Sequence, residues 1–117
     1  MLAGLHWLTR LDFSENRIQS IENLAFQPLR NLLFVDLSFN LLQKLTSATF
    51  EGLSHLTYLN LKSNQLDTID QSHVSMMTSL RHLIVEDNDL NNVEKGTFDE
   101  VSKAMRLNTF KIYVLVF

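Results

Sequence analysis

The sequence predicts a solenoid, a fold in which short structural repeats stack on one another. The first observation is that four asparagines follow one another at intervals of 24 residues: Asn16, Asn40, Asn64 and Asn88. The second is the frame around each Asn, in which apolar residues stand eight, five and three positions before it and two and five positions after it. A fixed period of roughly 20–50 residues is the signature of a repeat architecture. We therefore interpret the chain as one repeat array.

The alternation of residue types before each Asn predicts a short strand. In the third copy, Leu59 and Leu61 lie on one side of this strand and the residues between them on the other. One strand cannot bury its apolar face alone, but stacked copies share a continuous column, in which a fully buried Leu contributes about 1.5–3 kcal/mol. A further hydrophobe recurs ten positions after each Asn, as Phe26, Phe50, Val74 and Phe98.

The repeated Asn itself is polar, although it lies between hydrophobes and should be interior. A buried amide must be hydrogen-bonded, and Asn carries two N–H donors and an acceptor oxygen. We expect it to satisfy the backbone groups exposed where the chain turns out of the strand. Asn16, Asn40, Asn64 and Asn88 would then form a structural ladder along the stack.

Four frames share the pattern LxxLxLxxNxL or a close variant: LTRLDFSENRI (8–18), LLFVDLSFNLL (32–42), LTYLNLKSNQL (56–66) and LRHLIVEDNDL (80–90). With the Phe ten residues after the Asn, they resemble the 24-residue form of the leucine-rich repeat family, from residue 2 to about 101. The resemblance implies an α/β solenoid: a horseshoe segment with a parallel β-sheet on its concave face and irregular or short helical segments on its convex face. It also implies a binding role, because this form is similar to the repeats of extracellular receptors and matrix proteins, including Toll-like receptors.

The repeat pattern predicts a single domain over residues 1–117. Its parts are a partial repeat over 2–7, repeats starting near 8, 32, 56 and 80, and a degenerate repeat over about 104–117. In the degenerate repeat, a register shifted by three residues places Phe110 and Ile112 at the apolar strand positions and Leu115 at the Asn position. Neither end carries the polar cap that repeat arrays need for solubility, so self-association through the uncapped ends is expected.

The chain contains no cysteine, which leaves two explanations open. One is a protein of a reducing compartment, and the other is a piece of an extracellular protein cut inside its cysteine-rich caps. The start in mid-repeat favours the second explanation, whereas the absence of an Asn-x-Ser/Thr sequon opposes it. No apolar stretch approaches the roughly 20 residues of a membrane span, so direct membrane insertion is not expected. A net charge of −3 does not favour nucleic-acid binding.

Catalytic, metal and cofactor motifs are not found in the sequence. The four histidines fall at different phases of the repeat, without a His-Glu-x-x-His pattern or clustered carboxylates near them. No Gly-x-Ser-x-Gly elbow or phosphate-binding glycine loop occurs, and the chain has only three glycines. We therefore expect a protein that is not an enzyme and holds neither cofactor nor metal.

The candidate site consists of the strand residues that face away from the core. Adjacent parallel strands should stack them into columns, in which neighbouring residues are about 4.8 Å apart. The first column is Arg10, Phe34, Tyr58 and His82, the second is Asp12, Asp36, Asn60 and Ile84, and the third is Ser14, Ser38, Lys62 and Glu86. The predicted partner-binding residues are Arg10, Asp12, Phe34, Asp36, Tyr58, Asn60, Lys62, His82, Ile84 and Glu86. Aromatic and Arg side chains dominate the energetics of protein interfaces. The alternative is that Asp-Leu-Ser, as at residues 36–38, is common in strand frames of the family for scaffold reasons, and that exposed aromatics on strands reflect strand propensity.

The leading functional hypothesis is a ligand-recognition segment of an extracellular leucine-rich repeat protein, such as a receptor ectodomain, with a protein ligand or co-receptor as partner. Its expected location is extracellular or on the cell surface. The alternative is a cytoplasmic scaffold or regulatory subunit that holds an enzyme, and a third hypothesis is a truncated product without independent function. A signal peptide and a cysteine-rich cap upstream of Met1 would favour the first hypothesis.

Overall fold

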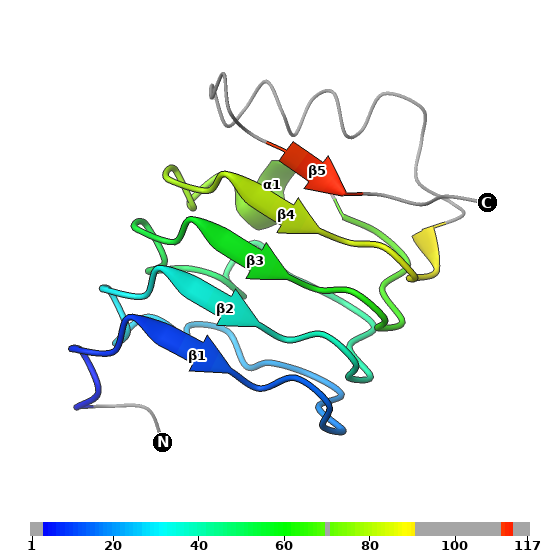
Figure 1. Ribbon diagram of the computed structural model, residues 1–117, viewed down its shortest axis with the longest axis horizontal. Helices are drawn as coiled ribbons and strands as arrows, with labels where there is room; N and C mark the ends of the chain where they lie inside the picture. Colours follow the sequence, from blue (N-terminus) through cyan, green and yellow to red (C-terminus); the bar gives the residue numbers. More distant parts are fainter. Residues whose placement is uncertain (1–3, 70, 91–110, 114–117) are drawn as a thin grey trace.

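The computed structural model describes residues 4–69, 71–90 and 111–113 and arranges them as a stack of coils (Figure 1). Its elements are β1 (Arg10–Asp12), β2 (Phe34–Asp36), β3 (Tyr58–Asn60), α1 (Gln71–Val74), β4 (His82–Ile84) and β5 (Lys111–Tyr113). The strands form one parallel sheet in the order β1-β2-β3-β4-β5. The predicted α/β solenoid with a parallel sheet is confirmed. We number its coils from the frames: the first coil starts at residue 8, the second at 32, the third at 56 and the fourth at 80.

The sheet keeps the 24-residue period from β1 to β4. Leu11 pairs with Val35, Val35 with Leu59, and Leu59 with Leu83. Backbone hydrogen bonds continue the pairing beyond the strands, as from Leu61 N to the Ile84 carbonyl at 2.8 Å. Each apolar strand centre therefore lies directly over the one before it.

The fifth strand departs from the predicted register. Ile112 of β5 pairs with Leu83, whereas the shifted frame of the sequence placed Phe110 at that level. The pairing therefore lies two residues later than predicted. Phe98 and Leu115 lie outside the described residues.

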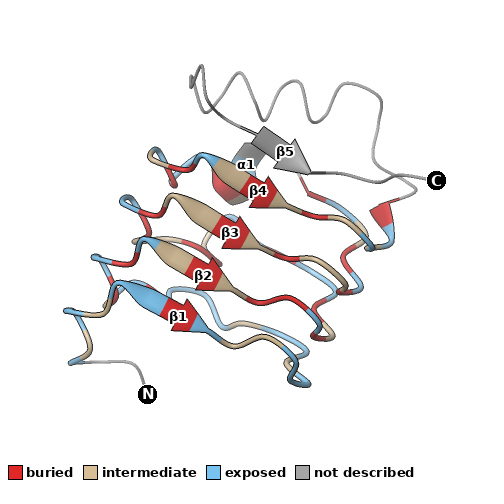
Figure 2. Cartoon of the chain, viewed as in Figure 1, coloured by how far each residue is buried: buried red, intermediate tan, exposed pale blue. Residues whose placement is uncertain are grey.

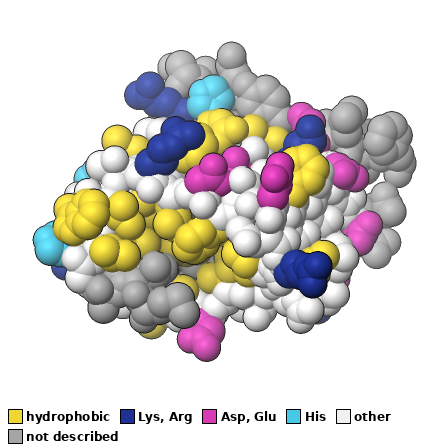
Figure 3. Space-filling view, turned by 60° about the horizontal axis from the view of Figure 1, so that its bottom comes forward, with side chains coloured by type: hydrophobic (Ala, Val, Ile, Leu, Met, Phe, Trp, Pro, Cys, Tyr) yellow, Lys and Arg dark blue, Asp and Glu magenta, His cyan; other side chains and the backbone are white. Residues whose placement is uncertain are grey.

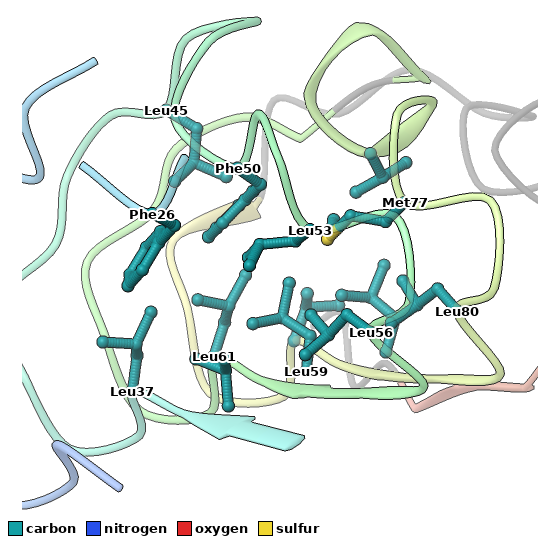
Figure 4. Packing of buried hydrophobic residues seen from close by; sticks show 14 of the residues in the cluster. Phe26, Leu37, Leu45, Phe50, Leu53, Leu56, Leu59, Leu61, Met77 and Leu80 are labelled. Atoms are coloured by element: carbon teal, nitrogen blue, oxygen red, sulfur yellow. The ribbon is translucent and has the colours of Figure 1, made fainter. Parts of the chain in front are cut away.

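One apolar core runs through the coils (Figure 4). The middle residue of each of the first four strands is buried, and its two neighbours are exposed or half-buried (Figure 2). On the opposite side of the coil, the hydrophobes ten positions after the Asn are buried at Phe26, Phe50 and Val74, and the first two rings stack with centroids 6.2 Å apart. In the first three coils, the strand side and the back therefore belong to one packed core.

Each of the four coils turns sharply at the residue before its Asn. Glu15, Phe39, Ser63 and Asp87 all have positive φ, between 56° and 58°. This left-handed conformation is unfavourable for a non-glycine residue by roughly 1–2 kcal/mol. It is held because the turn is fixed on both sides, by the strand pairing before it and by the Asn side chain after it.

The first coil forms an open end of the described stack. Leu5, Leu8, Phe13, Ile18 and Ile21 pack against the core but remain partly exposed. Their counterparts 24 residues later are buried: Leu29, Leu32, Leu37, Leu42 and Leu45. Figure 3 shows apolar side chains gathered over this end. The apolar end surface exists as the sequence predicts, and self-association through it stays a prediction.

Candidate functional site

The Asn side chains fasten neighbouring coils together at the edge of the candidate site. The amide of Asn64 donates to the Leu61 and Lys62 carbonyls of its own coil, at 3.1 and 3.3 Å. It also donates to the Leu37 carbonyl of the preceding coil at 3.0 Å, and its oxygen accepts from Leu42 N at 3.1 Å. One side chain thus satisfies four backbone groups from two coils.

The four Asn positions are not equivalent in their surroundings. Asn40 and Asn88 repeat the contacts of Asn64, with bonds to the coil before them and to their own turn. Asn16 donates only to the Phe13 and Ser14 carbonyls of its own coil and is exposed. The expectation of an interior Asn is therefore wrong for Asn16, because no described coil precedes the first one. Asn88 is half-buried, and only Asn40 and Asn64 are fully buried among the four.

The concave face carries a continuous stack of side chains across four strands. The Arg10 guanidinium lies 3.8 Å from the centroid of the Phe34 ring. The Phe34 and Tyr58 rings stack with centroids 4.6 Å apart and an angle of 5° between their planes. Tyr58 and His82 follow at 6.1 Å with a tilt of 47°. We call Arg10, Phe34, Tyr58 and His82 the aromatic column.

The strand register brings the aromatic column together, because its members pair directly across the sheet. An aromatic pair contributes about 0.5–1.5 kcal/mol beyond area burial, and an exposed cation–π contact about 0.5–1 kcal/mol. The stack runs along the column, so the ring faces of Phe34 and Tyr58 cover each other. The Tyr58 hydroxyl accepts from the Asn60 side chain at 3.5 Å, which links the first column to the second.

The polar side chains of the second column stabilise the turns that follow their strands. The Asp12 Oδ1 accepts from the backbone N and the hydroxyl of Ser14, at 3.0 and 2.6 Å. Asp36 accepts from Ser38 N at 2.9 Å, and Asn60 accepts from Lys62 N at 3.0 Å. Each side chain caps the turn that follows its strand, which agrees with the scaffold alternative for Asp-Leu-Ser.

The pKa of Asp12 is lowered from its ordinary value. The largest cause is the hydrogen bond from the Ser14 hydroxyl, followed by the bond from the Ser14 backbone N–H. Desolvation opposes the shift, and the positive charge of Arg10, the least of the causes, acts in the same direction as the hydrogen bonds. Asp12 therefore remains an anion at neutral pH.

The third column contributes two side chains to the surface. Lys62 and Glu86 are half-buried, whereas Ser38 is buried and belongs to the turn. The turn row beside this column, Glu15, Phe39, Ser63 and Asp87, adds a further exposed aromatic residue, because Phe39 is 50% exposed. The predicted partner-binding set did not include this row. Its signal in the sequence is its place directly before each Asn, next to the third column.

The convex side presents a different surface. A hollow of about 520 Å³ lies there, and its lining includes Arg30, Glu51, Gly52 and Met76. Gly52 has φ +100°, and a Cβ at this position would lie 2.7 Å from the Gln27 Cα, so the small residue allows the coils to approach closely. The hollow holds no stack of aromatic side chains among the described residues that line it.

Comparison with known proteins identifies the repeats. A family model described as leucine rich repeat matches residues 30–90, more than half of the chain. The chain belongs to the leucine-rich repeat family. A search of curated proteins found no match.

Solved leucine-rich repeat structures are similar to this chain. A leucine-rich repeat protein of Leptospira interrogans is 27% identical, with a TM-score of 0.71 over 90% of this chain and 25% of the other. The leucine-rich repeat domain of APL1 is 31% identical, with a TM-score of 0.63 over 69% of this chain and 21% of that domain's chain. An internalin of Listeria monocytogenes is 25% identical, with a TM-score of 0.61 over 72% of this chain and 23% of the other. This chain thus spans about a quarter or less of the length of these proteins.

Family membership supports a general role in protein–protein interaction, because leucine-rich repeat domains commonly bind proteins and are typically not enzymes. No helix among the described residues is long and apolar enough to cross a membrane.

Proposed function

We propose that the concave face of this chain binds a protein ligand or co-receptor. The observation that carries the proposal is the aromatic column, an unbroken stack over four strands on the side of the sheet that faces away from the core. Interfaces obtain most of their binding energy from a few Tyr, Trp and Arg side chains near their centre. Tyr58 occupies this central place, between Phe34 and His82.

The surrounding side chains supply the polar part of such an interface. Asp12, Asp36 and Asn60 lie beside the aromatic column in register, with Ile84 as the apolar member of their column. Lys62 and Glu86 follow two residues later along their coils. Their turn-capping bonds fix the side chains of Asp12, Asp36 and Asn60 in one orientation. A surface with fixed side chains loses little conformational entropy on binding, which favours affinity.

We further propose that the chain is a segment of an extracellular or cell-surface leucine-rich repeat protein, such as a receptor ectodomain. The support is its resemblance to the 24-residue repeats of that class. The absence of cysteine supports the alternative of a cytoplasmic scaffold or regulatory subunit. Both hypotheses use the same concave face.

The test of the binding face is the affinity of the Tyr58→Ala chain for a partner recovered with the parent chain. Truncating an aromatic anchor commonly costs about 2 kcal/mol or more, so the Kd should rise by roughly 30-fold. The matched control is Thr68→Ala, an exposed residue after the Asn and off the sheet, which should leave the Kd unchanged. Unfolding should stay cooperative for both variants, because neither side chain lies in the core.

The opposite pattern would overturn the proposal. If the partner binds Tyr58→Ala as tightly as the parent but is lost on substitution of the convex residue His55, the binding surface lies on the back of the solenoid. If neither substitution changes the Kd of a folded chain, neither face contributes through the residues named, and the concave proposal fails.

A further inference from the structure

The concave face and the turn row beside it have an excess of negative charge. In the first four coils, two cations, Arg10 and Lys62, share this surface with five carboxylates: Asp12, Glu15, Asp36, Glu86 and Asp87. A third cationic residue, Lys111 of β5, pairs with His82 at the end of the sheet, on the aromatic column and away from the carboxylates of the first coils. The carboxylates all lie toward the carboxyl ends of the strands, in the second and third columns and in the turn row. The aromatic column lies toward the amino ends.

The charge of Arg10 acts on Asp12, but no described cation lies within ion-pair distance of any of these carboxylates. None of the five forms an ion pair with a described residue, whereas Lys44 and Asp67, in the segments that follow the Asn, pair at 3.2 Å. The nearest cation to Asp12, Arg10, lies over the Phe34 ring. Unpaired carboxylates that share one surface repel one another, and a cationic partner would relieve this repulsion.

Aromatic side chains lie on both sides of the second column in the second coil, where Asp36 stands between Phe34 and Phe39. The half-buried rings of Phe34 and Tyr58 lie on one side, and Phe39, 50% exposed, lies on the other. Neighbouring columns are two residues apart along the strand, about 6.6 Å, and neighbouring strands are about 4.8 Å apart. A Lys or Arg side chain can lay its methylene stem on the rings while its charged head reaches a carboxylate of the next column.

We propose that the concave face takes a basic segment of a protein partner, with cationic side chains over Asp12 and Asp36 and apolar contacts on the aromatic column and Phe39. The proposal deepens the proposed function and rests on it. Charge complementarity of this kind steers association and rejects partners of like charge. An acidic segment would meet five like charges at this surface.

The test uses two synthetic 12-residue peptides that share a central Phe and differ only in carrying four Lys or four Glu. Each is titrated against the full chain by fluorescence anisotropy at low ionic strength. The Lys peptide should bind with a saturable Kd that weakens as salt is added, because salt screens exposed charges. The Glu peptide should not bind.

The deciding variant is Asp12→Asn with Asp36→Asn. Asn keeps the acceptor oxygen that caps the turn, as Asn60 does in the third coil, so the fold should be retained. The Kd of the Lys peptide should rise about tenfold, which is the effect of losing roughly 1.4 kcal/mol. The matched control is Glu22→Gln with Glu51→Gln, which removes the same charge from other parts of the coils and should change the Kd less than twofold.

Three results would overturn the inference. The Lys peptide could fail to bind at millimolar concentration, the Glu peptide could bind as tightly, or the two double variants could weaken the Lys peptide equally, which would show attraction to net charge alone. Affinity measurements with the recovered partner distinguish a failure of this inference from a failure of the proposed function. If the partner's affinity falls with Tyr58→Ala but not with the Asp12 and Asp36 double variant, the concave face is the binding surface, and the inference of a basic partner segment is wrong. If neither affects it, both proposals fail.

Discussion

The first and third coils carry the same pattern of apolar residues and an Asn at the same place, but these equivalent residues differ in how far they are buried. In the third coil, Leu61, Asn64 and Leu66 are buried, with the first and last fully removed from solvent. In the first coil, the equivalent Phe13 and Ile18 are half-buried and Asn16 is exposed. A leucine-rich coil therefore does not bury its own core. Burial is a property of the neighbours on both sides, as expected of a repeat protein with nearest-neighbour energetics.

The largest test of this comparison is truncation of the same core position in both coils. Leu66→Ala removes a fully buried side chain between two coils and should cost about 2–5 kcal/mol, from lost burial and the cavity left behind. Ile18→Ala should cost clearly less, because its side chain already faces solvent in part. Denaturant unfolding of both variants measures the difference. Equal costs would mean that the first coil is covered in solution.

The Asn positions allow the next comparison. Asn64→Leu removes the partner of four backbone groups from two coils and should cost on the order of 1–3 kcal/mol, although Leu is apolar and similar in size. Asn16→Leu should be nearly neutral, because Asn16 bonds only to exposed groups of its own turn. An unchanged denaturation midpoint for Asn64→Leu would show that the ladder does not stabilise the stack.

The sequence predicted the features that every coil repeats, namely the strand positions and the columns of side chains. The 24-residue period and the alternation of residue types were sufficient to place Phe34, Tyr58 and His82 in one column, because both are local patterns that each strand repeats. They could not distinguish Asn16 from Asn64. The two lie in the same frame, and the difference comes from the coil on the other side.

Two further features depend on geometry that the pattern does not record. The register of β5 was placed two residues early, because the frame before it is degenerate and several apolar residues compete for the strand centre. The turn-capping bonds of Asp12, Asp36 and Asn60 were not predicted, since the sequence left a scaffold role and a binding role open for such residues. The structure shows the scaffold bond directly, and the binding role stays a prediction for the same residues.

The turn row provides a smaller test, in which stability and binding should change in opposite directions. Phe39 holds a left-handed backbone conformation while its ring is half-exposed, and Asn tolerates this conformation far better. Phe39→Asn should therefore leave the fold as stable or stabilise it by roughly 0.5–1 kcal/mol. It should also weaken binding of the Lys peptide.

The control for Phe39 is Ser63→Asn, at the same place in the third coil and with the same positive φ. It should leave the affinity unchanged, because the residue it replaces offers no ring. A loss of stability in Phe39→Asn would show that the ring packs on the turn more strongly than its exposure indicates, and unchanged affinity would remove Phe39 from the site.

The smallest expected effect is a pKa change at Asp12. It tests whether the concave face of the first coil keeps its order although the core of that coil is partly exposed. Although core side chains of the first coil are only half-buried, Asp12 caps its turn as Asp36 does in the second coil. The carboxylate should therefore keep its position and charge at the end of the stack. The pKa of Asp12 is lowered mainly by the Ser14 hydroxyl. Ser14→Ala should raise this pKa toward its ordinary value of 3.8, but not fully, because the backbone N–H of residue 14 and the charge of Arg10 remain.

The sign of the linked stability effect follows from the direction of the shift. A carboxyl whose pKa is lower in the folded chain contributes stability above its unfolded pKa, and this contribution is lost as the pH falls through the folded pKa. Acid unfolding of Ser14→Ala should therefore be less dependent on Asp12 than that of the parent. Nuclear magnetic resonance titration of the Asp12 carboxyl measures the shift, with Thr68→Ala as the control that should leave it unchanged. A titration midpoint unaffected by Ser14→Ala would mean that the cap is open in the first coil, and that the concave face loses its order at the end of the stack together with the core.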